Sequence, residues 1–220
     1  EKGCMIELAS SDPSIVSVAP YGGTKPAFTP NPIAIGIPTN KNPILIDISA
    51  SITTNGLTGR LFSEGKKLPG DWVQDKSGRA TNDPAVLFTE PPGTILPIGG
   101  KEYGHKGFGL ALMIEALTQG LSGLGRADPT EGWGAAVYLK VTDPSAFGGM
   151  DEFTRQTSWL AESCRNNPPA EGVDNVRLPG DNAILNKAEA IANGLELYPG
   201  LLDGLKTFSD NYNIRVPGAI

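Results

Sequence analysis

The chain has 220 residues, with 18 Lys and Arg against 24 Asp and Glu, giving a formal net charge of −6. This acidic balance argues against a nucleic-acid binder, which needs a basic surface to displace the counterions of the phosphates. Apolar residues make up 39% of the chain, as in ordinary globular proteins, and no stretch reaches the ~20 apolar residues of a membrane span. The two cysteines, Cys4 and Cys164, and a single histidine are too few for a disulfide framework or a zinc site. We expect both thiols to be reduced and buried, in a cytoplasmic protein without a metal.

The first half of the chain predicts short strands joined by turns. Apolar, β-branched runs predict four strands, over residues 4–9, 15–19, 33–37 and 44–48. Between the first two, Asp12 and Pro13 favour a turn. The strand over 44–48 is apolar on both faces except for Asp47, so we expect it to be central in its sheet. Glycine and proline crowd residues 51–97, which we interpret as turn-rich.

The helices are predicted late in the chain. The expected ranges are 108–124, 150–165, 183–193 and 201–212, with one more strand over 135–141. The first of these helices is apolar or small at nearly every position and should be buried on most sides. Alternating strand–helix units of the kind that build a parallel sheet are not evident. The predicted fold class is therefore α+β with a mainly antiparallel sheet.

Residues 96–109 hold five glycines and two lysines just before the first long helix. Such a segment suits an anion, because glycines let the backbone approach, helix amides point outward and Lys106 carries a full charge. It is not a Walker A loop, since Gly107 follows the lysine, and it lacks the third glycine and preceding strand of a Rossmann fingerprint. A plain surface turn with a solvated lysine is an equally good interpretation. The sequence gives His105 no carboxylate partner, so we interpret it as exposed rather than as a general acid.

Two further clusters have both a structural and a functional interpretation. The carboxylate of Asp47 and the hydroxyls of Ser49 and Ser51 can hydrogen-bond the hydroxyls of a ligand. The favoured alternative is that one of the serines caps a short following helix. Before the helix at 183–193, Asp181 or Asn182 is a good N-cap, which alone accounts for that motif. We interpret Asp75 as a turn residue rather than a catalytic one.

Taken in order, the motifs resemble those of the type-2 malate/L-lactate dehydrogenases, a family that includes ureidoglycolate, sulfolactate and diketogulonate members. The residues that carry the resemblance are Ser11-Asp12-Pro13, Pro20-Tyr21-Gly22-Gly23, Asn31-Pro32, Ile46-Asp47-Ile48-Ser49-Ala50-Ser51, Pro69, Trp72, Asp75, Asp83-Pro84, Leu96-Pro97-Ile98-Gly99-Gly100, Lys106-Gly107-Phe108-Gly109-Leu110, Leu121-Ser122-Gly123 and Leu178-Pro179-Gly180-Asp181. Each motif is weak alone, but so many in one order are specific.

The resemblance implies an oxidoreductase that moves a hydride between NAD or NADP and a small 2-hydroxy or 2-oxo acid. It also implies a non-Rossmann fold and a homodimer. The residues it implies as cofactor contacts are Ser11, near the reacting end, Asp47, Ile48, Ser49, Lys106 at the charged part, and Pro179, Gly180 and Asp181, which would close over the cofactor.

The chain also departs from the family pattern. Thr29-Pro30 stands where many members have Gly-Thr before the Asn-Pro step. The family's catalytic histidine and substrate-clamping arginine are expected upstream of residue 1, and His105 does not align with that histidine. We therefore expect residues 1–220 to be a truncated dehydrogenase chain, mostly the cofactor-binding region and C-terminal helices, inactive alone and without a catalytic residue of its own. The alternative is an incomplete fragment or a non-enzymatic remnant of the same fold. A serine hydrolase is disfavoured because no G-x-S-x-G motif occurs.

Overall fold

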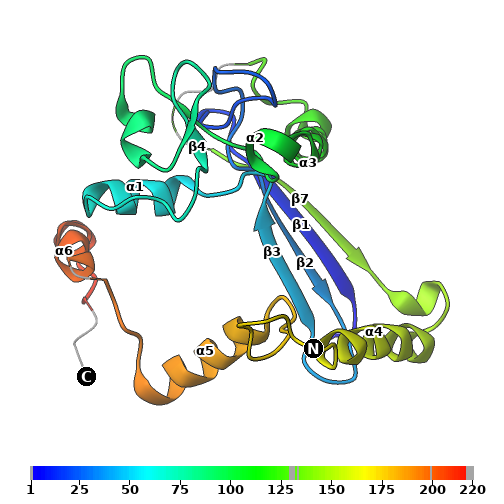
Figure 1. The fold of residues 1–220 in the computed structure, drawn as a ribbon. Coiled ribbons are helices and arrows are strands. Elements are labelled where there is room, and N and C mark those ends of the chain that lie inside the picture. Colours follow the sequence, from blue (N-terminus) through cyan, green and yellow to red (C-terminus); the bar gives the residue numbers. More distant parts are fainter. Residues whose placement is uncertain (1, 129–131, 133, 199, 217–220) are drawn as a thin grey trace. The chain divides into compact units, whose positions relative to one another are not determined.

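The computed structural model describes residues 2–128, 132, 134–198 and 200–216 (Figure 1). It divides into two compact units, Glu1–Pro179 and Gly180–Ile220. We describe each unit by itself.

The first unit is built on a four-stranded antiparallel sheet of order β3-β2-β1-β7 (Figure 1). Its strands are β1 (Met5–Ser11), β2 (Pro32–Ile37), β3 (Ile44–Ser49) and β7 (Ala136–Thr142). They match four of the predicted strands to within two residues, and all their pairings are antiparallel, so the predicted α+β class is confirmed. Neighbouring registers place Leu139, Leu8, Ala34 and Asp47 in one row across the sheet.

The prediction that the strand over 44–48 is central is wrong, because β3 is an edge strand. Ile44 is buried, but Leu45 and Ile48 are 39% and 43% exposed. The pattern of apolar side chains indicates whether the two faces of a strand are covered, but it does not indicate whether another strand pairs with each edge. Beyond β3, the Leu45 amide donates to the Pro179 carbonyl at 3.0 Å.

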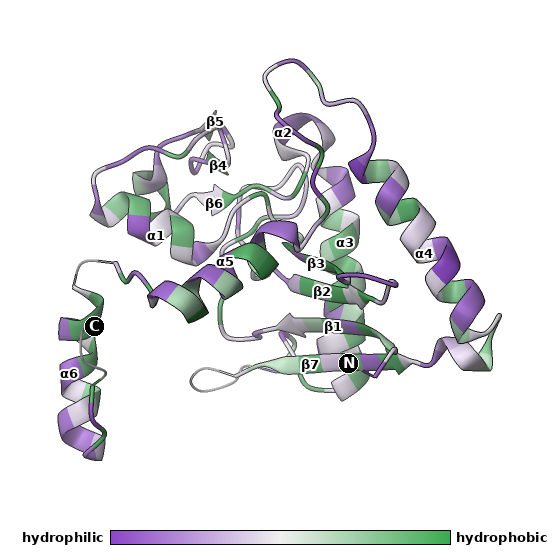
Figure 2. Ribbon diagram, turned by 90° about the horizontal axis from the view of Figure 1, so that it is seen from below, coloured by the Kyte–Doolittle hydropathy of each residue, from purple (hydrophilic) through white to green (hydrophobic). Residues whose placement is uncertain are grey.

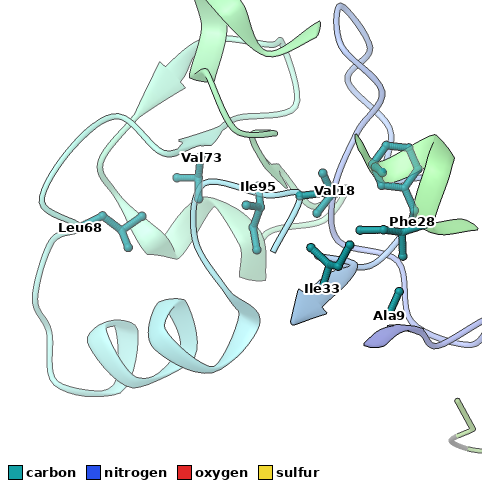
Figure 3. Packing of buried hydrophobic residues seen from close by; sticks show 10 residues of the cluster. Ala9, Val18, Phe28, Ile33, Leu68, Val73 and Ile95 are labelled. Atoms are coloured by element: carbon teal, nitrogen blue, oxygen red, sulfur yellow. The ribbon is translucent and has the colours of Figure 1, made fainter. Parts of the chain in front are cut away.

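The predicted strand over 15–19 is also wrong as a strand, although its centre forms bridges. Val18 is 1% exposed and bridges both Phe28 and Ile95. The Ile95 bridge connects this segment to a second, three-stranded antiparallel sheet of order β5-β4-β6. Its strands are β4 (Val73–Gln74), β5 (Ala80–Thr81) and β6 (Thr94–Ile95). The main core lies around these bridges (Figure 3).

The turn-rich interpretation of residues 51–97 missed a helix, α1 (Asn55–Ser63). Its N-cap is Thr54, whose hydroxyl accepts from the Leu57 amide at 3.2 Å, so neither Ser49 nor Ser51 has the predicted capping role. A short 3-10 helix, η1 (Pro84–Phe88), follows, and the Asp83 carboxylate accepts from the Ala85 amide at its start.

The predicted helix over 108–124 begins earlier and is less buried than expected. It consists of α2 (Gly100–Tyr103), α3 (His105–Glu115) and a π-helical turn, η2 (Ala116–Gly120). One face, with Ala111, Ile114 and Thr118, is buried, while Leu112 and Leu121 are 51% and 71% exposed. The expectation of burial on most sides is therefore wrong, because within the described residues only one face of this helix is covered.

The rest of the first unit is η3 (Pro144–Ala146) and α4 (Met150–Arg165), which ends where predicted. α4 carries alternating polar and apolar bands (Figure 2) and contacts the β2–β3 turn, where the Thr157 hydroxyl donates to the Pro38 carbonyl at 2.7 Å. Cys4 and Cys164 have free thiols but are half-buried, so the prediction of full burial is wrong. Among the described residues, no helix has both the length and the apolarity to cross a membrane.

The second unit contains α5 (Asp181–Asn193) and α6 (Leu201–Tyr212), close to the predicted ranges. The N-cap of α5 is Gly180, at a φ of 97°, rather than Asp181 or Asn182. Asp181 lies instead in the first helical turn, where its charge complements the helix dipole.

Candidate functional site

The two segments that the sequence singled out for ligand binding, 47–51 and 96–109, are in direct contact. The Ile52 amide donates to the Leu96 carbonyl and the Ile98 amide donates to the Ala50 carbonyl, both at 2.9 Å. The start of α3 packs on this pairing at Gly107, where an added Cβ would lie 2.3 Å from the Ile98 nitrogen and 2.5 Å from the Ala50 oxygen. The glycine is therefore needed for close approach rather than for an unusual φ.

Around this contact, several of the predicted site residues face solvent. Asp47 and Ile48 are exposed on β3, and Ser49 is half-buried. Lys106 is exposed at the start of α3, with its ammonium nitrogen 5.4 Å from the centre of the Tyr103 ring. Lysine at this distance from an aromatic ring has a weak cation–π attraction that holds the ammonium near the surface.

The third predicted segment is divided between the two units. Pro179 lies beside β3, since its carbonyl accepts from Leu45, two residues before Asp47. Gly180 and Asp181 open α5 in the second unit.

The backbone amides of the glycine-rich segment are less available to an anion than expected. Gly104 has helical φ and ψ, so α2 leads directly into α3 and the start of α3 is not an open helix end. Four amides already donate to backbone carbonyls: Gly100 to Pro97, Tyr103 to Gly99, Gly107 to Ile98 and Phe108 to Gly104. Any charge that this segment offers to a ligand therefore comes from a side chain such as Lys106 rather than from these amides.

A ladder of hydroxyl groups continues from the end of β3. Ser49 donates to the Ser51 carbonyl at 2.9 Å and Ser51 donates to the Thr53 carbonyl at 2.6 Å. The Thr53 hydroxyl is buried and has no hydrogen-bond partner among the residues that the structure describes. Because the one hydroxyl hydrogen of Ser49 is donated to Ser51, the Ser49 oxygen can only accept a hydrogen bond from a ligand.

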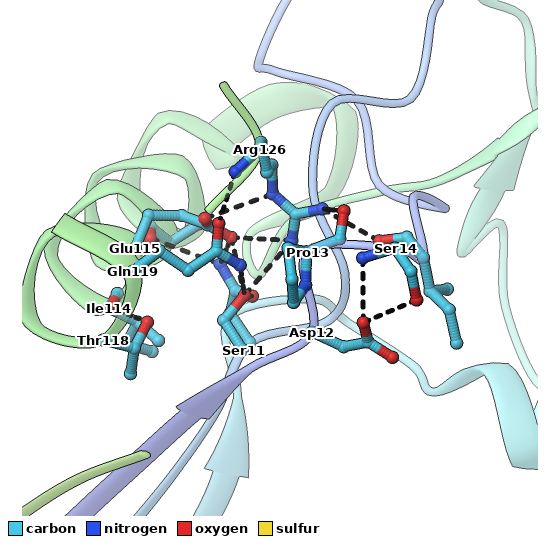
Figure 4. A network of polar contacts seen from close by, with 12 residues as sticks. Ser11, Asp12, Pro13, Ser14, Ile114, Glu115, Thr118, Gln119 and Arg126 are labelled. Carbon is cyan, nitrogen blue, oxygen red and sulfur yellow. Dashed lines mark hydrogen bonds and ion pairs between the residues drawn. The ribbon is translucent and has the colours of Figure 1, made fainter. Parts of the chain in front are cut away.

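A buried polar network that the sequence analysis missed lies next to these segments (Figure 4). Glu115, at the end of α3, accepts from the Ser11 hydroxyl at 2.8 Å and the Asn31 amide group at 2.9 Å. It also forms a two-bond pair with Arg126, with Nη2 2.9 Å from Oε1 and Nε 3.1 Å from Oε2. One signal was visible in the sequence, since Glu115 is the lone charged residue in an apolar run.

Arg126 uses its whole hydrogen-bonding capacity in this network. A guanidinium has five N–H donors. Besides the two that go to Glu115, Nη2 donates to the Ser11 hydroxyl at 3.1 Å, and Nη1 donates to the carbonyls of Pro13 and Ile15 at 3.4 and 2.9 Å. Lysine cannot reproduce this arrangement, because its three donors radiate from one nitrogen.

Ser11 is saturated by the same network. It is 1% exposed, and its hydroxyl accepts from Gln119 Nε2 at 3.0 Å as well as from Arg126. Its single hydrogen goes to Glu115 Oε1 or Asn31 Oδ1, each 2.8 Å away. Direct contact of this hydroxyl with a cofactor remains a prediction, and it would require one of these bonds to break.

Asn31 links the network to the segment after β3. It is fully buried at a φ of 54°, a left-handed conformation that Asn tolerates better than most residues. Its side chain contacts Ser11 and Glu115, and its backbone carbonyl accepts from the Ala50 amide at 3.1 Å.

The two remaining candidates, Asp75 and His105, lie outside this network. Asp75 accepts from the amides of Ser77 and Arg79 and from the Ser77 hydroxyl, and the latter bond is the main reason why its pKa is lowered. The interpretation of Asp75 as a turn residue is confirmed. His105 is exposed, as expected, with its ring 5.8 Å from that of Tyr21.

Comparison with known proteins decides the family. The model of the malate/L-lactate dehydrogenase family matches residues 1–206. The chain belongs to this family. It is 32% identical over 218 residues to an L-sulfolactate dehydrogenase of Methanothermobacter thermautotrophicus, and 29% identical over 208 residues to an L-lactate dehydrogenase of Cupriavidus necator. A crystal structure of malate dehydrogenase from Entamoeba histolytica has the same fold, with a TM-score of 0.85 at 23% identity.

This family member spans less than two thirds of the length of these relatives. The matches cover 96% and 92% of the chain, but 59% of the sulfolactate enzyme and 58% of the lactate enzyme. The structural match covers 98% of the chain and 63% of the Entamoeba protein.

Proposed function

We propose that this chain forms part of a dehydrogenase that transfers a hydride between a nicotinamide cofactor and a small 2-hydroxy or 2-oxo acid. The observation that carries the proposal is the family match over residues 1–206. Relatives named as dehydrogenases of lactate, sulfolactate, malate and ureidoglycolate support the substrate class. Because every one of these relatives is named as an enzyme, they also favour a dehydrogenase over a non-enzymatic remnant.

The exposed groups around β3 and α3 fit a dinucleotide. The Asp47 carboxylate can accept from ribose hydroxyls, and Ile48 offers an apolar surface beside it. Lys106 supplies a positive charge for the pyrophosphate. The buried Thr53 hydroxyl, which has no partner within the described part of the chain, supports this fit as an unused polar group near the segment. We propose that these groups, Ser49 and Pro179 hold the cofactor. For Gly180 and Asp181, a contact with the cofactor is proposed from the family resemblance alone.

When bound, the nicotinamide ring would supply the hydride chemistry. The residues of this chain would bind and orient the cofactor and exclude water from part of it. We assign none of the described residues to proton transfer. The exposed setting of His105, whose ring contacts Tyr21, does not provide the oriented partner that a general acid needs.

We also propose that the cofactor is bound without a Rossmann fold and that the protein is a homodimer. The named strands of the two described sheets pair only antiparallel, which supports the first point, because a Rossmann site lies at the carboxyl ends of parallel strands. The dimer rests on the family resemblance, and its test is the mass of the purified protein in solution.

Cofactor binding and turnover by the full-length protein test the proposed function. A panel of 2-oxo acids is assayed with NADH and with NADPH, and the affinity for each cofactor is measured by fluorescence titration. Lys106→Ala should weaken binding about tenfold, as expected for a lost charge-assisted contact. Lys101→Ala, which removes a second exposed lysine from the same segment, is the control. Equal affinities in all three proteins would remove Lys106 from the site.

The same titration addresses the choice between NAD and NADP. A carboxylate that accepts from ribose hydroxyls repels an added 2′-phosphate. Asp47→Asn keeps the shape of the side chain and removes its charge. The variant should therefore bind NADPH relatively better than the wild-type protein does, and an unchanged ratio of the two affinities would place Asp47 away from the ribose.

A further inference from the structure

The ion pair of Glu115 and Arg126 lies beside the end of β1 and is connected through Asn31 to the end of β3, where the proposed cofactor site begins. Both side chains are largely buried, at 18% and 20% exposure. Through Ser11 the pair fixes the end of β1, and through the carbonyls of Pro13 and Ile15 it fixes the turn that follows. None of these atoms reaches the exposed groups of the proposed site directly.

A second connection runs through Asn31 to the other side of the site. Glu115 Oε1 and the Ala111 carbonyl hold the Asn31 amide group, at 2.9 and 3.3 Å, and so maintain the left-handed backbone at this residue. The Ala50 amide, one residue after Ser49, donates to the carbonyls of both Pro30 and Asn31, at 2.9 and 3.1 Å. A change at Glu115 is therefore two hydrogen bonds away from the end of β3.

We propose that Glu115 and Arg126 are positioning residues, which hold Ser49–Ala50 and the end of β1 in the geometry that binds the cofactor. This inference rests on the proposed function. In this proposal Ser11 does not touch the cofactor. Its hydroxyl, which already has its hydrogen-bond partners, connects the ion pair to the end of β1. The polar groups of the network form hydrogen bonds mainly with one another, and we infer that these bonds fix the position of the neighbouring backbone.

Glu115→Gln in the full-length protein tests the proposal. Glutamine keeps the length of the side chain but removes the charge and turns one acceptor into a donor, which faces the donors of Arg126, Ser11 or Asn31. We expect the dissociation constant for the preferred cofactor to rise about tenfold, as when a supporting partner of a binding group is lost. The KM for the 2-oxo acid should change by less than twofold.

Hydrogen exchange gives a second readout that does not depend on turnover. In the cofactor-free variant, the amides of residues 49–52 should exchange faster than in the wild-type protein, because Asn31, one of the two residues whose carbonyls accept from the Ala50 amide, is no longer fixed in position. Arg126→Lys, which keeps the positive charge but loses the forked donor geometry, should shift both readouts in the same direction and serves if Glu115→Gln does not fold. The matched control is Glu152→Gln, which breaks the exposed Glu152–Arg155 pair and should shift neither.

The outcomes separate the two proposals. A wild-type protein that binds neither NADH nor NADPH overturns the proposed function and this inference with it. A wild-type protein that binds, with variants that bind within twofold of it and exchange at the same rate, overturns the inference alone. Variants that only melt at a lower temperature, with unchanged affinity well below the melting temperature, show a purely structural pair and also overturn it.

Discussion

Two polar regions lie next to one another in the first unit, and they differ in what satisfies their hydrogen bonds. Around Glu115, a largely buried carboxylate and guanidinium and a buried hydroxyl form hydrogen bonds with neighbouring protein groups. Around Asp47 and Lys106, charged side chains face solvent. The first region can hold a backbone in place but has little capacity left for a ligand. The second region has that capacity, and the accuracy with which its side chains are placed depends on the residues that support them.

The largest expected effect comes from the point where the two proposed binding segments touch. Gly107→Ala puts a Cβ within 2.5 Å of two backbone atoms, which cannot yield as a flexible side chain would. We expect a loss of about 3 kcal/mol in the free energy of unfolding, at the upper end for overpacking. Denaturant unfolding of the full-length protein measures it.

Gly109→Ala is the matched control for this prediction. It lies two residues further along the same helix, and an added Cβ would meet nothing within 4 Å. Alanine is the better helix former by about 1 kcal/mol, so this variant should be slightly more stable than the wild-type protein. If both variants lost stability equally, the close packing of α3 on Ala50 would be refuted.

An intermediate effect is expected at Asn31. Asn31→Ala removes the bonds to Ser11 and Glu115 and places a less tolerant residue at positive φ, for a combined loss of about 2–3 kcal/mol. Asn31→Gly removes the same bonds but tolerates the backbone conformation. It should recover about 1 kcal/mol of that loss in the same unfolding measurement. Equal losses in the two variants would mean that the left-handed backbone is not retained.

The smallest effect is expected at an exposed ion pair in the same unit. The pKa of Asp83 is lowered below 3.8, first by its contact with Lys67 and then by the Ala85 amide. A lowered carboxyl pKa stabilises the fold above the unfolded value, and this contribution disappears as the pH falls through the folded value. Asp83→Asn should therefore cost at most about 0.5 kcal/mol near pH 7 and nothing at a pH well below 3.8. A loss that persisted in acid would assign the effect to the cap of η1 instead.

The sequence predicts where strands and helices lie along this chain better than it predicts which strands pair with one another. The strands that form the main sheet and the helices α4 to α6 follow from periodicity and turn residues. The edge position of β3 does not, because the apolar pattern of Ile44–Ile48 carries no information about its neighbours. Helix α1 was missed because Gly56 and Gly59 made it look like a loop.

The candidate site shows the same division. Exposed groups such as Asp47 and Lys106 stand in motifs that can be read along the chain. The network was invisible because its bonds join residues far apart in sequence, as from Ser11 to Glu115 and Arg126. Only the isolated charge of Glu115 within an apolar helix pointed to a buried partner, and no local pattern identified Arg126.

Pro179 has a consequence for the open side of the main sheet. It presents a carbonyl to Leu45 on the edge strand, but a proline nitrogen carries no hydrogen with which to return a bond. A fifth strand therefore cannot propagate through this residue. At Leu45 the edge of the sheet meets an acceptor without a returning donor, which discourages another polypeptide from adding to the edge at this point.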